Sequence, residues 1–395
     1  MCTLSLYVHI PFCISKCGYC DFNSYAMNGP IVSKTVDAIL TEIQFSGYPN
    51  GTVQSIFFGG GTPTFVNPDN LQRILVSLRD RFSVTPEAEI TVEANPGSAD
   101  MQRFADLRSV GFNRISIGVQ SFNDNLLHHL ERRHSAAEAV RAVEIAREAG
   151  FENINIDLMF GIPGQTEADW RESLQTALSL QTEHISLYSL TIEPKTRFEH
   201  LQRIGQLPLP DEEVMLAMYE HAIETARQAG FEHYEISNFA KLGYQCRHNV
   251  NYWHNGPYAA YGPGAVSCLW EDAKGARYRR WTNELSPRKY LQKIESNEPL
   301  SVEEEAVSKM TALGESMMVG LRMMEGVSLG GLYRRYRIDP ALVYEREIAK
   351  LIERGLIQIA DDRIALTRQG LLLANDVMLE FIALPDENQF TMTHH

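Results

Sequence analysis

Short apolar runs alternate with amphipathic stretches over roughly the first 236 residues. The apolar runs are rich in Val, Ile and Phe and predict strands, and the stretches between them have the period of amphipathic helices. The expected strands are Leu4–Ile10, Val53–Phe58, Ile90–Glu93, Arg114–Gln120, Ile154–Phe160, Ile185–Leu190 and His233–Ile236. The expected helices lie near 33–46, 68–81, 100–109, 135–149, 167–180 and 211–229.

Alternating strands and helices of this length predict right-handed βαβ units and a parallel sheet. Six or seven such units favour an α/β fold with a full or partial parallel (β/α) barrel, and a doubly wound open sheet is the alternative. In both folds, ligands bind at the carboxyl ends of the strands. We therefore assign 1–236 to a barrel core.

The alternation of strand and helix patterns ends after Gly230. Residues 237–300 are rich in Tyr, Trp, Gly and Asn, and we expect an irregular segment that faces the substrate. Residues 301–385 predict a helical, winged-helix-like module with 10 basic and 13 acidic side chains, a balance that favours packing over DNA binding. Its expected elements are helices at 302–322, 328–336, 341–354 and 367–382 and a hairpin from Leu356–Ala360 to Arg363–Leu366.

Charge and hydropathy restrict the partners. The chain has 36 basic and 50 acidic residues, a net charge of −14, which disfavours broad contact with nucleic acid. No apolar run reaches the roughly 18 residues of a transmembrane helix, and the N-terminal segment lacks a signal-peptide pattern. We expect a cytoplasmic protein.

Three of the six cysteines fall within eight residues, in the pattern Cys13-x-x-x-Cys17-x-x-Cys20 directly after the first expected strand. Cytosolic cysteines are normally reduced, so this crowding indicates a metal site rather than a disulfide framework. Thiolates are the ligands of iron–sulfur clusters, and three of them on a four-iron cluster leave one iron open. The alternative is a structural zinc site completed by His9 or a distant group, although zinc sites more often have paired cysteine knuckles.

This cysteine spacing resembles that of the radical S-adenosylmethionine (SAM) superfamily. So do the surrounding segments, Tyr7-Val-His-Ile-Pro-Phe-Cys13 and Cys17-Gly-Tyr-Cys20-Asp-Phe. Within it, the chain is similar to the branch that contains the oxygen-independent coproporphyrinogen III oxidases and the haem chaperones. The similarity extends from Tyr7 to the C-terminal module. It implies a [4Fe–4S] cluster on Cys13, Cys17 and Cys20 and SAM at the open iron.

Polar and glycine residues at the strand ends match the SAM-binding positions of that family. Gly59-Gly60-Gly61-Thr62-Pro63 lets the backbone approach a ligand closely, and Pro63 excludes a phosphate-binding P-loop. The resemblance implies a first SAM site with Tyr7, Gly60 and Glu93. It implies a second SAM-contacting set formed by Tyr19, Gly61, Thr62, Gln120, Arg132 and Asp157.

Two features separate the chaperone branch from the oxidase branch. The oxidases of the family have the pattern Cys-x-x-x-Cys-x-x-Cys-x-Cys, whereas this chain has Phe22 in place of the fourth cysteine. The oxidases also have a long N-terminal extension, whereas the first expected strand of this chain begins at residue 4. His248-Asn249-Val-Asn-Tyr252-Trp253 matches the haem-binding pattern of the chaperones, with His254 and Cys246 as alternative iron ligands.

The resemblance therefore implies a haem chaperone that transfers haem to acceptor haemoproteins. Any contact with a membrane would come through an acceptor. Coproporphyrinogen III oxidase activity is not expected, and a radical SAM enzyme of the oxidase type is the alternative function. Imidazole is a common axial ligand of haem iron, and the aromatic residues near His248 offer surface for the macrocycle. These residues are Tyr244, Tyr252, Trp253, Tyr258 and Tyr261.

Overall fold

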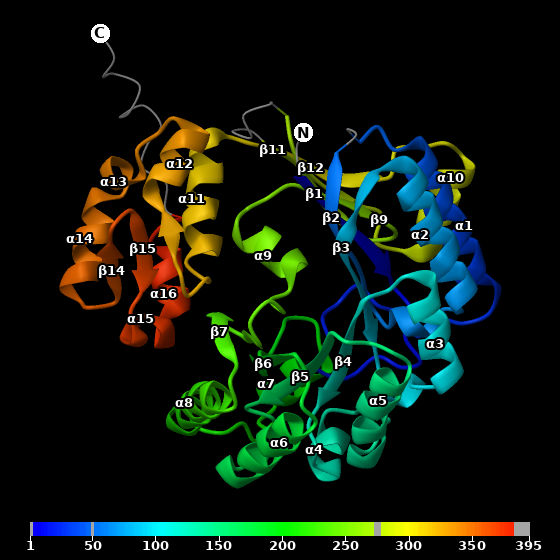
Figure 1. The fold of residues 1–395 in the computed structure, drawn as a ribbon, viewed down its shortest axis with the longest axis horizontal. Coiled ribbons are helices and arrows are strands. Elements are labelled where there is room, and N and C mark those ends of the chain that lie inside the picture. The colour runs from blue at the N-terminus through cyan, green and yellow to red at the C-terminus, as the bar shows by residue number, and fades with distance from the viewer. Residues whose placement is uncertain (1–2, 49–50, 272–277, 383–395) are drawn as a thin grey trace.

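The computed structural model describes residues 3–48, 51–271 and 278–382. Twelve strands of these segments form one open sheet, and a smaller module follows at the C-terminus (Figure 1). The sheet order is β12-β11-β10-β9-β1-β2-β3-β4-β5-β6-β8-β7. Because this order does not close on itself, the α/β core is a partial barrel.

Six parallel strands and their helices occur where the sequence predicts them, although β3 begins at Ser83 rather than at Ile90. The strands are β1 Thr3–Ile10, β2 Thr52–Gly60, β3 Ser83–Ala94, β4 Arg114–Gln120, β5 Ile154–Phe160 and β6 His184–Ser189. The predicted helices are α1 Pro30–Phe45, α2 Pro68–Arg81, α3 Met101–Val110, α5 Ala136–Glu148, α6 Glu167–Ser179 and α8 Glu212–Gln228. Two short helices, α4 Asp124–His129 and α7 Arg197–Arg203, were not predicted. Capping boxes at Ser135 and Thr166 define where α5 and α6 begin.

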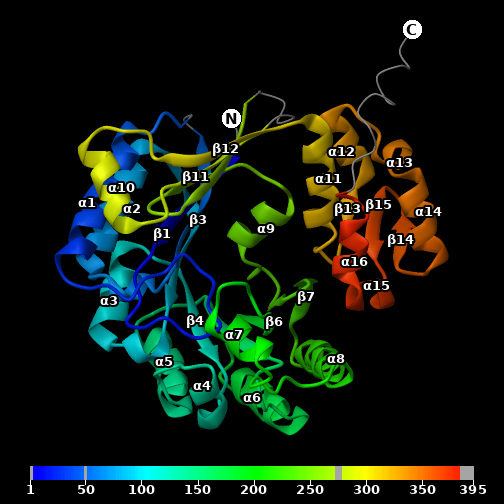
Figure 2. The ribbon, with the colours of Figure 1, turned by 180° about the vertical axis from the view of Figure 1, so that it is seen from behind.

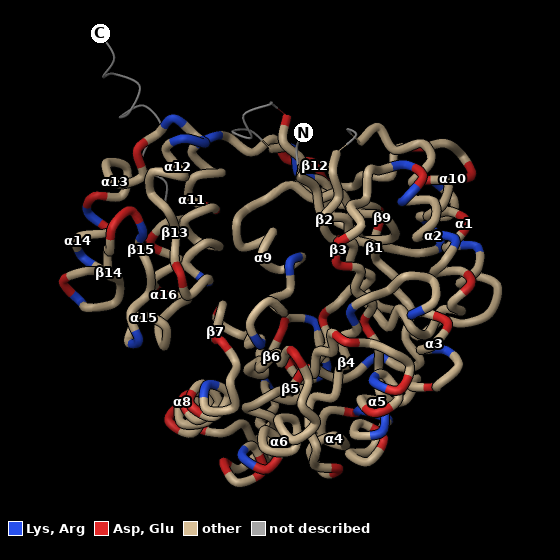
Figure 3. Tube along the Cα trace, in the orientation of Figure 1, with Lys and Arg blue, Asp and Glu red and all other residues tan. Residues whose placement is uncertain are grey.

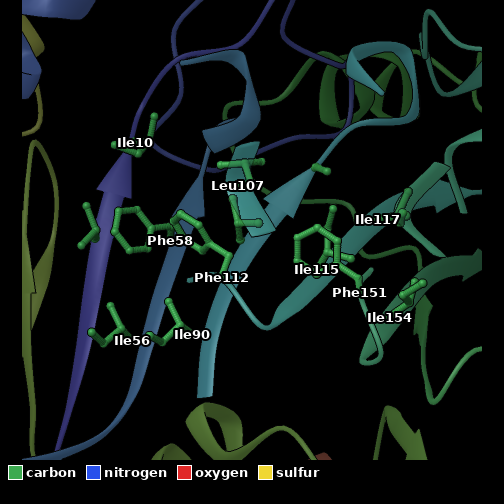
Figure 4. Close-up of a cluster of buried hydrophobic side chains, with 14 of the residues drawn as sticks. Ile10, Ile56, Phe58, Ile90, Leu107, Phe112, Ile115, Ile117, Phe151 and Ile154 are labelled. Carbon is green, nitrogen blue, oxygen red and sulfur yellow. The ribbon is translucent and has the colours of Figure 1, made fainter. Parts of the chain in front are cut away.

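The helices cover the outer face of the curved sheet (Figure 1). Alternate strand residues are apolar and pack outward against them, as in the cluster around Phe58 and Phe112, whose rings meet edge to face at 5.0 Å (Figure 4). The other strand residues face inward and are mostly polar. The barrel therefore has an apolar outside, covered by helices, and a polar inside.

The seventh predicted strand exists but does not extend the parallel barrel. β7 Glu232–Glu235 pairs with β8 Asn238–Ala240, and β8 runs antiparallel to β6. At the other side of the barrel, β9 Tyr258–Tyr261 pairs in parallel with β1. The barrel thus has six consecutive parallel strands, and β9 arrives from much later in the chain.

The prediction that 237–300 is irregular was wrong. This segment contains α9 Arg247–Trp253, β10 Val266–Trp270, the described strand β11 Tyr278–Asn283 and α10 Pro287–Glu295. α9 lies inside the barrel, between β2 and the C-terminal module (Figures 1 and 2). Of the aromatic residues in this segment, Phe239, Tyr261, Tyr278 and Tyr290 are buried, and the others are partly exposed.

The helix predicted over 302–322 was also partly wrong. Ser301–Val307 forms β12, which pairs antiparallel with β11, and only Lys309–Gly320 forms a helix, α11. The acidic run in β12 is held by its neighbour, because Arg279 pairs with Glu304 at 2.7 Å. Tertiary pairing has overridden the helix propensity of glutamate.

The C-terminal module has its own hydrophobic core and a three-stranded sheet. The predicted hairpin is confirmed, and Asp362 in its turn accepts a hydrogen bond from the backbone N–H of Gly330 at 2.8 Å. The helices predicted over 341–354 and 367–382 are each divided into two. The elements after α11 are β13 Val327–Ser328, α12 Leu329–Tyr336, α13 Pro340–Val343, α14 Glu345–Glu353, β14 Ile357–Ala360, β15 Arg363–Leu366, α15 Arg368–Leu372 and α16 Ala374–Leu379.

Acidic and basic residues are intermixed over the outer helices and the C-terminal module (Figure 3). None of the helices in the described segments is long and apolar enough to cross a lipid bilayer.

Candidate functional site

The three clustered cysteines lie on the loop that follows β1, at the carboxyl end of the barrel strands. The backbone N–H of Cys13 donates to the carbonyl of Tyr25 at 3.0 Å, and that of Cys20 donates to Cys17 at 3.2 Å, so the loop folds back on itself. All three are free, partly exposed thiols that line one cavity of about 400 Å³.

Each thiol has a polar neighbour. Cys13 Sγ lies 3.6 Å from Thr62 Oγ1, and Arg132 Nη1 donates to Cys17 Sγ at 3.7 Å. Cys20 Sγ lies 3.9 Å from the hydroxyl of Ser24. Burial raises the pKa of Cys13 and of Cys20, so these thiols need a metal or a nearby cation to become thiolates.

The donor set fits an iron–sulfur cluster, since it consists of three thiols in one cavity with a guanidinium beside them. Within the described segments, no three His, Cys, Asp or Glu side chains are grouped as ligands of a single metal ion. His9, the residue suggested to complete a zinc site, has both ring nitrogens engaged. Its Nε2 donates to the carbonyl of Asn23 at 2.9 Å, and its Nδ1 accepts from the hydroxyl of Tyr7 at 3.1 Å.

The glycine loop after β2 packs directly against the cysteine loop. The backbone N–H groups of Gly61 and Thr62 donate to the carbonyls of Ile10 and Phe12, each at 2.8 Å. A Cβ atom at Gly61 would lie 2.6 Å from the carbonyl oxygen of Phe12, and Gly60 has a φ of +114°. These positions therefore need glycine, Gly60 for its backbone conformation and Gly61 for its contact with the cysteine loop.

Two predicted carboxylates face the same interior space. Glu93 accepts a hydrogen bond from the N–H of Gly60 at 3.1 Å, and burial, with the charge of Asp157, raises the pKa of Glu93 to about 8. Asp157 accepts from the amide of Asn155 at 2.7 Å and from Ser116 at 3.2 Å, and burial raises its pKa as well. Hydrogen bonds thus fix two carboxyl groups with raised pKa values in the same cavity.

The remaining predicted SAM positions surround the cysteine loop. Arg132 donates through Nη2 to the carbonyl of Gly118, while its buried Nε finds no partner among the described residues. Gln120 has the left-handed φ of +69°, which turns the chain at the end of β4. Burial raises the pKa of Tyr19, whose ring packs near Phe198. All the predicted SAM residues line the two interior cavities.

A second cavity of about 520 Å³ extends from the cysteine loop to α9 and shares Cys20, Glu93 and Asp157 with the first. The imidazole of His248 lies at its α9 end and is only 1% exposed. Its Nδ1 lies 3.0 Å from the hydroxyl of Ser55, and its Nε2 lies 3.1 Å from that of Tyr252. Burial lowers the pKa of His248 to about 3, so the ring is neutral.

The alternative iron ligands and most of the expected aromatic surface lie elsewhere. Trp253 packs beneath the guanidinium of Arg322 at 4.5 Å, next to the C-terminal module. His254 is half exposed, 3.9 Å from the carboxylate of Glu325, and Cys246 is fully buried. Of the motif, the cavity lining includes His248, Asn249 and Tyr252. The expectation that Trp253 covers a macrocycle is therefore not supported by its position.

Sequence reasoning missed the inward-facing polar residues of the strands that also line the second cavity. They include Arg114, Ser116, Asn155, Ser186 and Tyr188. The available signal was the alternation of polar and apolar residues within β4, β5 and β6, which places every second side chain inside the barrel.

Comparisons with known proteins agree with this architecture. Residues 7–177 match the radical SAM superfamily, and residues 307–373 match the HemN C-terminal domain. The coproporphyrinogen III oxidase HemN from Escherichia coli, a radical SAM enzyme, has the same fold, with a TM-score of 0.80 at 24% identity over 96% of this chain and 90% of that chain. The molecule is thus built on the radical SAM scaffold.

Comparison with relatives of similar length identifies the family within this superfamily. The chain is 37% identical to the heme chaperone HemW of Bacillus subtilis (strain 168), covering 96% of this chain and 99% of that protein. It is 41% identical to the heme chaperone HemW of Escherichia coli (strain K12), covering 73% and 76% respectively. The chain therefore belongs to the HemW family.

Proposed function

We propose that this protein is a haem chaperone, which binds haem and transfers it to acceptor haemoproteins. The observation that carries the proposal is the shared interior: the cysteine loop and the helix with His248 face adjoining cavities with common lining residues.

In this proposal Cys13, Cys17 and Cys20 hold a [4Fe–4S] cluster, and SAM binds at its open iron. The bound cluster and SAM would supply electron-transfer and ligand-exchange chemistry. Arg132 keeps positive charge beside Cys17. Glu93, Asp157 and the bare backbone of Gly60 offer acceptors and donors for the polar groups of SAM.

Haem would occupy the second cavity, with His248 as the axial ligand. The ring is neutral, as iron ligation requires, but its Nε2 must first release Tyr252. Burial of the macrocycle supplies most of the affinity, on the order of 25 cal/mol per Å² before ordering costs. Phe22 and Ile14, 61% and 51% exposed, give the cysteine loop an apolar edge at the cavity mouth.

Phe22 also supports the chaperone over the oxidase-type enzyme. It occupies the position at which the oxidase pattern has a fourth cysteine, and it lines both cavities. We further propose a cytoplasmic location, no nucleic-acid partner, and membrane contact only through an acceptor. The net charge of −14 supports the last two points, because it disfavours broad contact with nucleic acid or anionic lipid.

The test uses anaerobically reconstituted protein in two parallel assays. A Soret band on adding haemin, followed by transfer of haem to an apo-haemoprotein, is the expected result. His248→Ala should alter the band and speed haem release, and His254→Ala is the matched control. Turnover of coproporphyrinogen III with SAM and a reductant, without haem transfer, would contradict the proposal in favour of the oxidase-type enzyme.

A further inference from the structure

A chain of hydrogen bonds crosses the floor of the barrel from Asp157 to the first residue before α9. Asn155 Nδ2 donates to Asp157 Oδ1 at 2.7 Å, and His184 Nδ1 lies 2.6 Å from Asn155 Oδ1. His184 Nε2 lies 2.9 Å from the hydroxyl of Tyr234, which accepts from the backbone N–H of Cys246 at 3.3 Å. The four residues from Asn155 to Cys246 are buried.

The direction of every bond in this chain is determined by its ends. A carboxylate and an amide oxygen only accept, so His184 carries its proton on Nδ1. Its Nε2 must then accept from the hydroxyl of Tyr234, whose oxygen receives the N–H of Cys246. Burial lowers the pKa of His184 well below its usual value, so the ring is neutral, with a single proton for this tautomer. All donors therefore point toward Asp157.

The far end of the chain holds the helix that carries His248. Glu89 on β3, 6% exposed, accepts from the backbone N–H groups of Arg247 at 3.0 Å and His248 at 3.2 Å. The same carboxylate accepts from Cys246 Sγ at 3.4 Å. The first turn of α9 is therefore fixed by Tyr234 from one side and by Glu89 from the other.

We propose that His184 and Tyr234 are positioning residues that couple SAM binding at Asp157 to the placement of α9. A ligand that hydrogen-bonds Asp157 weakens it as an acceptor for Asn155, and in a cooperative chain each following bond adjusts. The adjustment ends at the N-terminus of α9 and so at His248. This inference rests on the proposed SAM site and needs no haem to be tested.

The experiment measures amide hydrogen exchange of residues 247–253 in cluster-loaded protein, with and without saturating SAM, and SAM binding by equilibrium dialysis. In the wild type, SAM should speed exchange in α9 about fivefold or more, the range of a typical coupling between sites, because the weakened chain holds the start of α9 less firmly. Tyr234→Phe removes the central oxygen of the chain and keeps the ring. It should still bind SAM, with a change in α9 below about twofold.

Matched variants separate coupling from simple packing. Tyr219→Phe removes another half-buried hydroxyl, which donates to the carbonyl of Ile236 at 2.7 Å outside the chain, and should retain the full SAM effect. If Tyr234→Phe does not fold, His184→Gln should retain the effect, because glutamine offers both a donor and an acceptor, and His184→Leu should lose it. An equal SAM effect in Tyr234→Phe and the wild type would overturn the coupling, as would no effect despite SAM binding. Failure of SAM to bind the wild type would instead contradict the proposed SAM site, and the coupling with it.

Discussion

Nε2 of His248 lies 3.1 Å from the hydroxyl oxygen of Tyr252, one turn further along α9. Its other nitrogen, Nδ1, lies 3.0 Å from Ser55 Oγ, so both ring nitrogens are engaged. Iron ligation by Nε2 of His248 would therefore have to replace its hydrogen bond with Tyr252.

The first prediction follows from this competition. Tyr252→Phe keeps the ring but removes the hydroxyl, which frees Nε2 and should raise haem affinity roughly two- to tenfold, the value of one hydrogen bond. The Soret maximum should stay at the wild-type position, because the ligand is unchanged. Haem titration followed by absorbance measures both quantities.

Controls for this prediction use the other two proposed ligands. His254→Ala and Cys246→Ala should leave the Soret maximum unchanged, whereas His248→Ala should shift it. A shifted band in either control, with a normal band in His248→Ala, would place the axial ligand elsewhere.

The second prediction concerns the cluster. Reconstituted wild-type protein should contain about four irons per chain, and Cys13→Ala, Cys17→Ala or Cys20→Ala should each abolish the cluster. Cys268→Ala is the matched control, since this cysteine is buried in β10. Iron and sulfide analysis decides the outcome. Haem binding should persist in the cluster variants while transfer declines, and zinc without iron after anaerobic purification would rule out the cluster.

The third prediction tests the close packing of the glycine loop. Gly61→Ala places a Cβ atom 2.6 Å from the backbone of Phe12, so the cysteine loop must shift. Iron content after reconstitution should fall severalfold, and the melting temperature should fall by several degrees. Gly97→Ala is the control, because the nearest atom to its new Cβ would be 3.8 Å away. Equal iron content in the two variants would show that the loop tolerates the displacement.

The fourth prediction concerns pH. Burial raises the pKa of Glu93 to about 8, whereas an unfolded glutamate titrates near 4.3. Between these values the folded state binds more protons than the unfolded state, so this residue's contribution to the free energy of unfolding decreases as pH rises. Glu93→Gln resembles the protonated form and escapes this loss.

We therefore expect the variant to gain stability over the wild type between pH 5 and pH 9, by up to about a few kcal/mol. Thermal unfolding of the metal-free proteins at these two pH values measures the difference, with pH 5 as the reference. A difference that does not change with pH would mean that Glu93 is ionised throughout.

The sequence predicted those parts of the fold whose signals are local. β4 and β5 match their predicted ranges, and so does α2, because apolar period and flanking cap residues coincide there. β12 was predicted as helix because its glutamates favour helix, while the arginines that hold it lie on another strand. No local pattern carries that information.

The site residues also fall into those with a local sequence signal and those without one. Cys13 and Gly60 could be found because the carboxyl end of a barrel strand is where ligand-binding residues collect. The floor of the barrel could not be found, because the partners of its residues are distant in the sequence. Glu89 acquires its partners only when α9 enters from far along the chain, and His184 bonds Asn155 on β5 and Tyr234 on β7. The contact between Nδ1 of His248 and Ser55 on β2 has the same origin.

The neighbours of β1 have a consequence for how the molecule is made. β1 pairs on one side with β2 and on the other with β9, in a register that joins Ser5 to Tyr258. During synthesis one edge of β1 therefore remains unpaired until residues 258–261 have left the ribosome. An unpaired strand edge can associate with other chains. α9 immediately precedes β9, so closing this edge and inserting the motif helix are one late event. Nascent chains stalled before Tyr258 should be the species that most needs protection from aggregation.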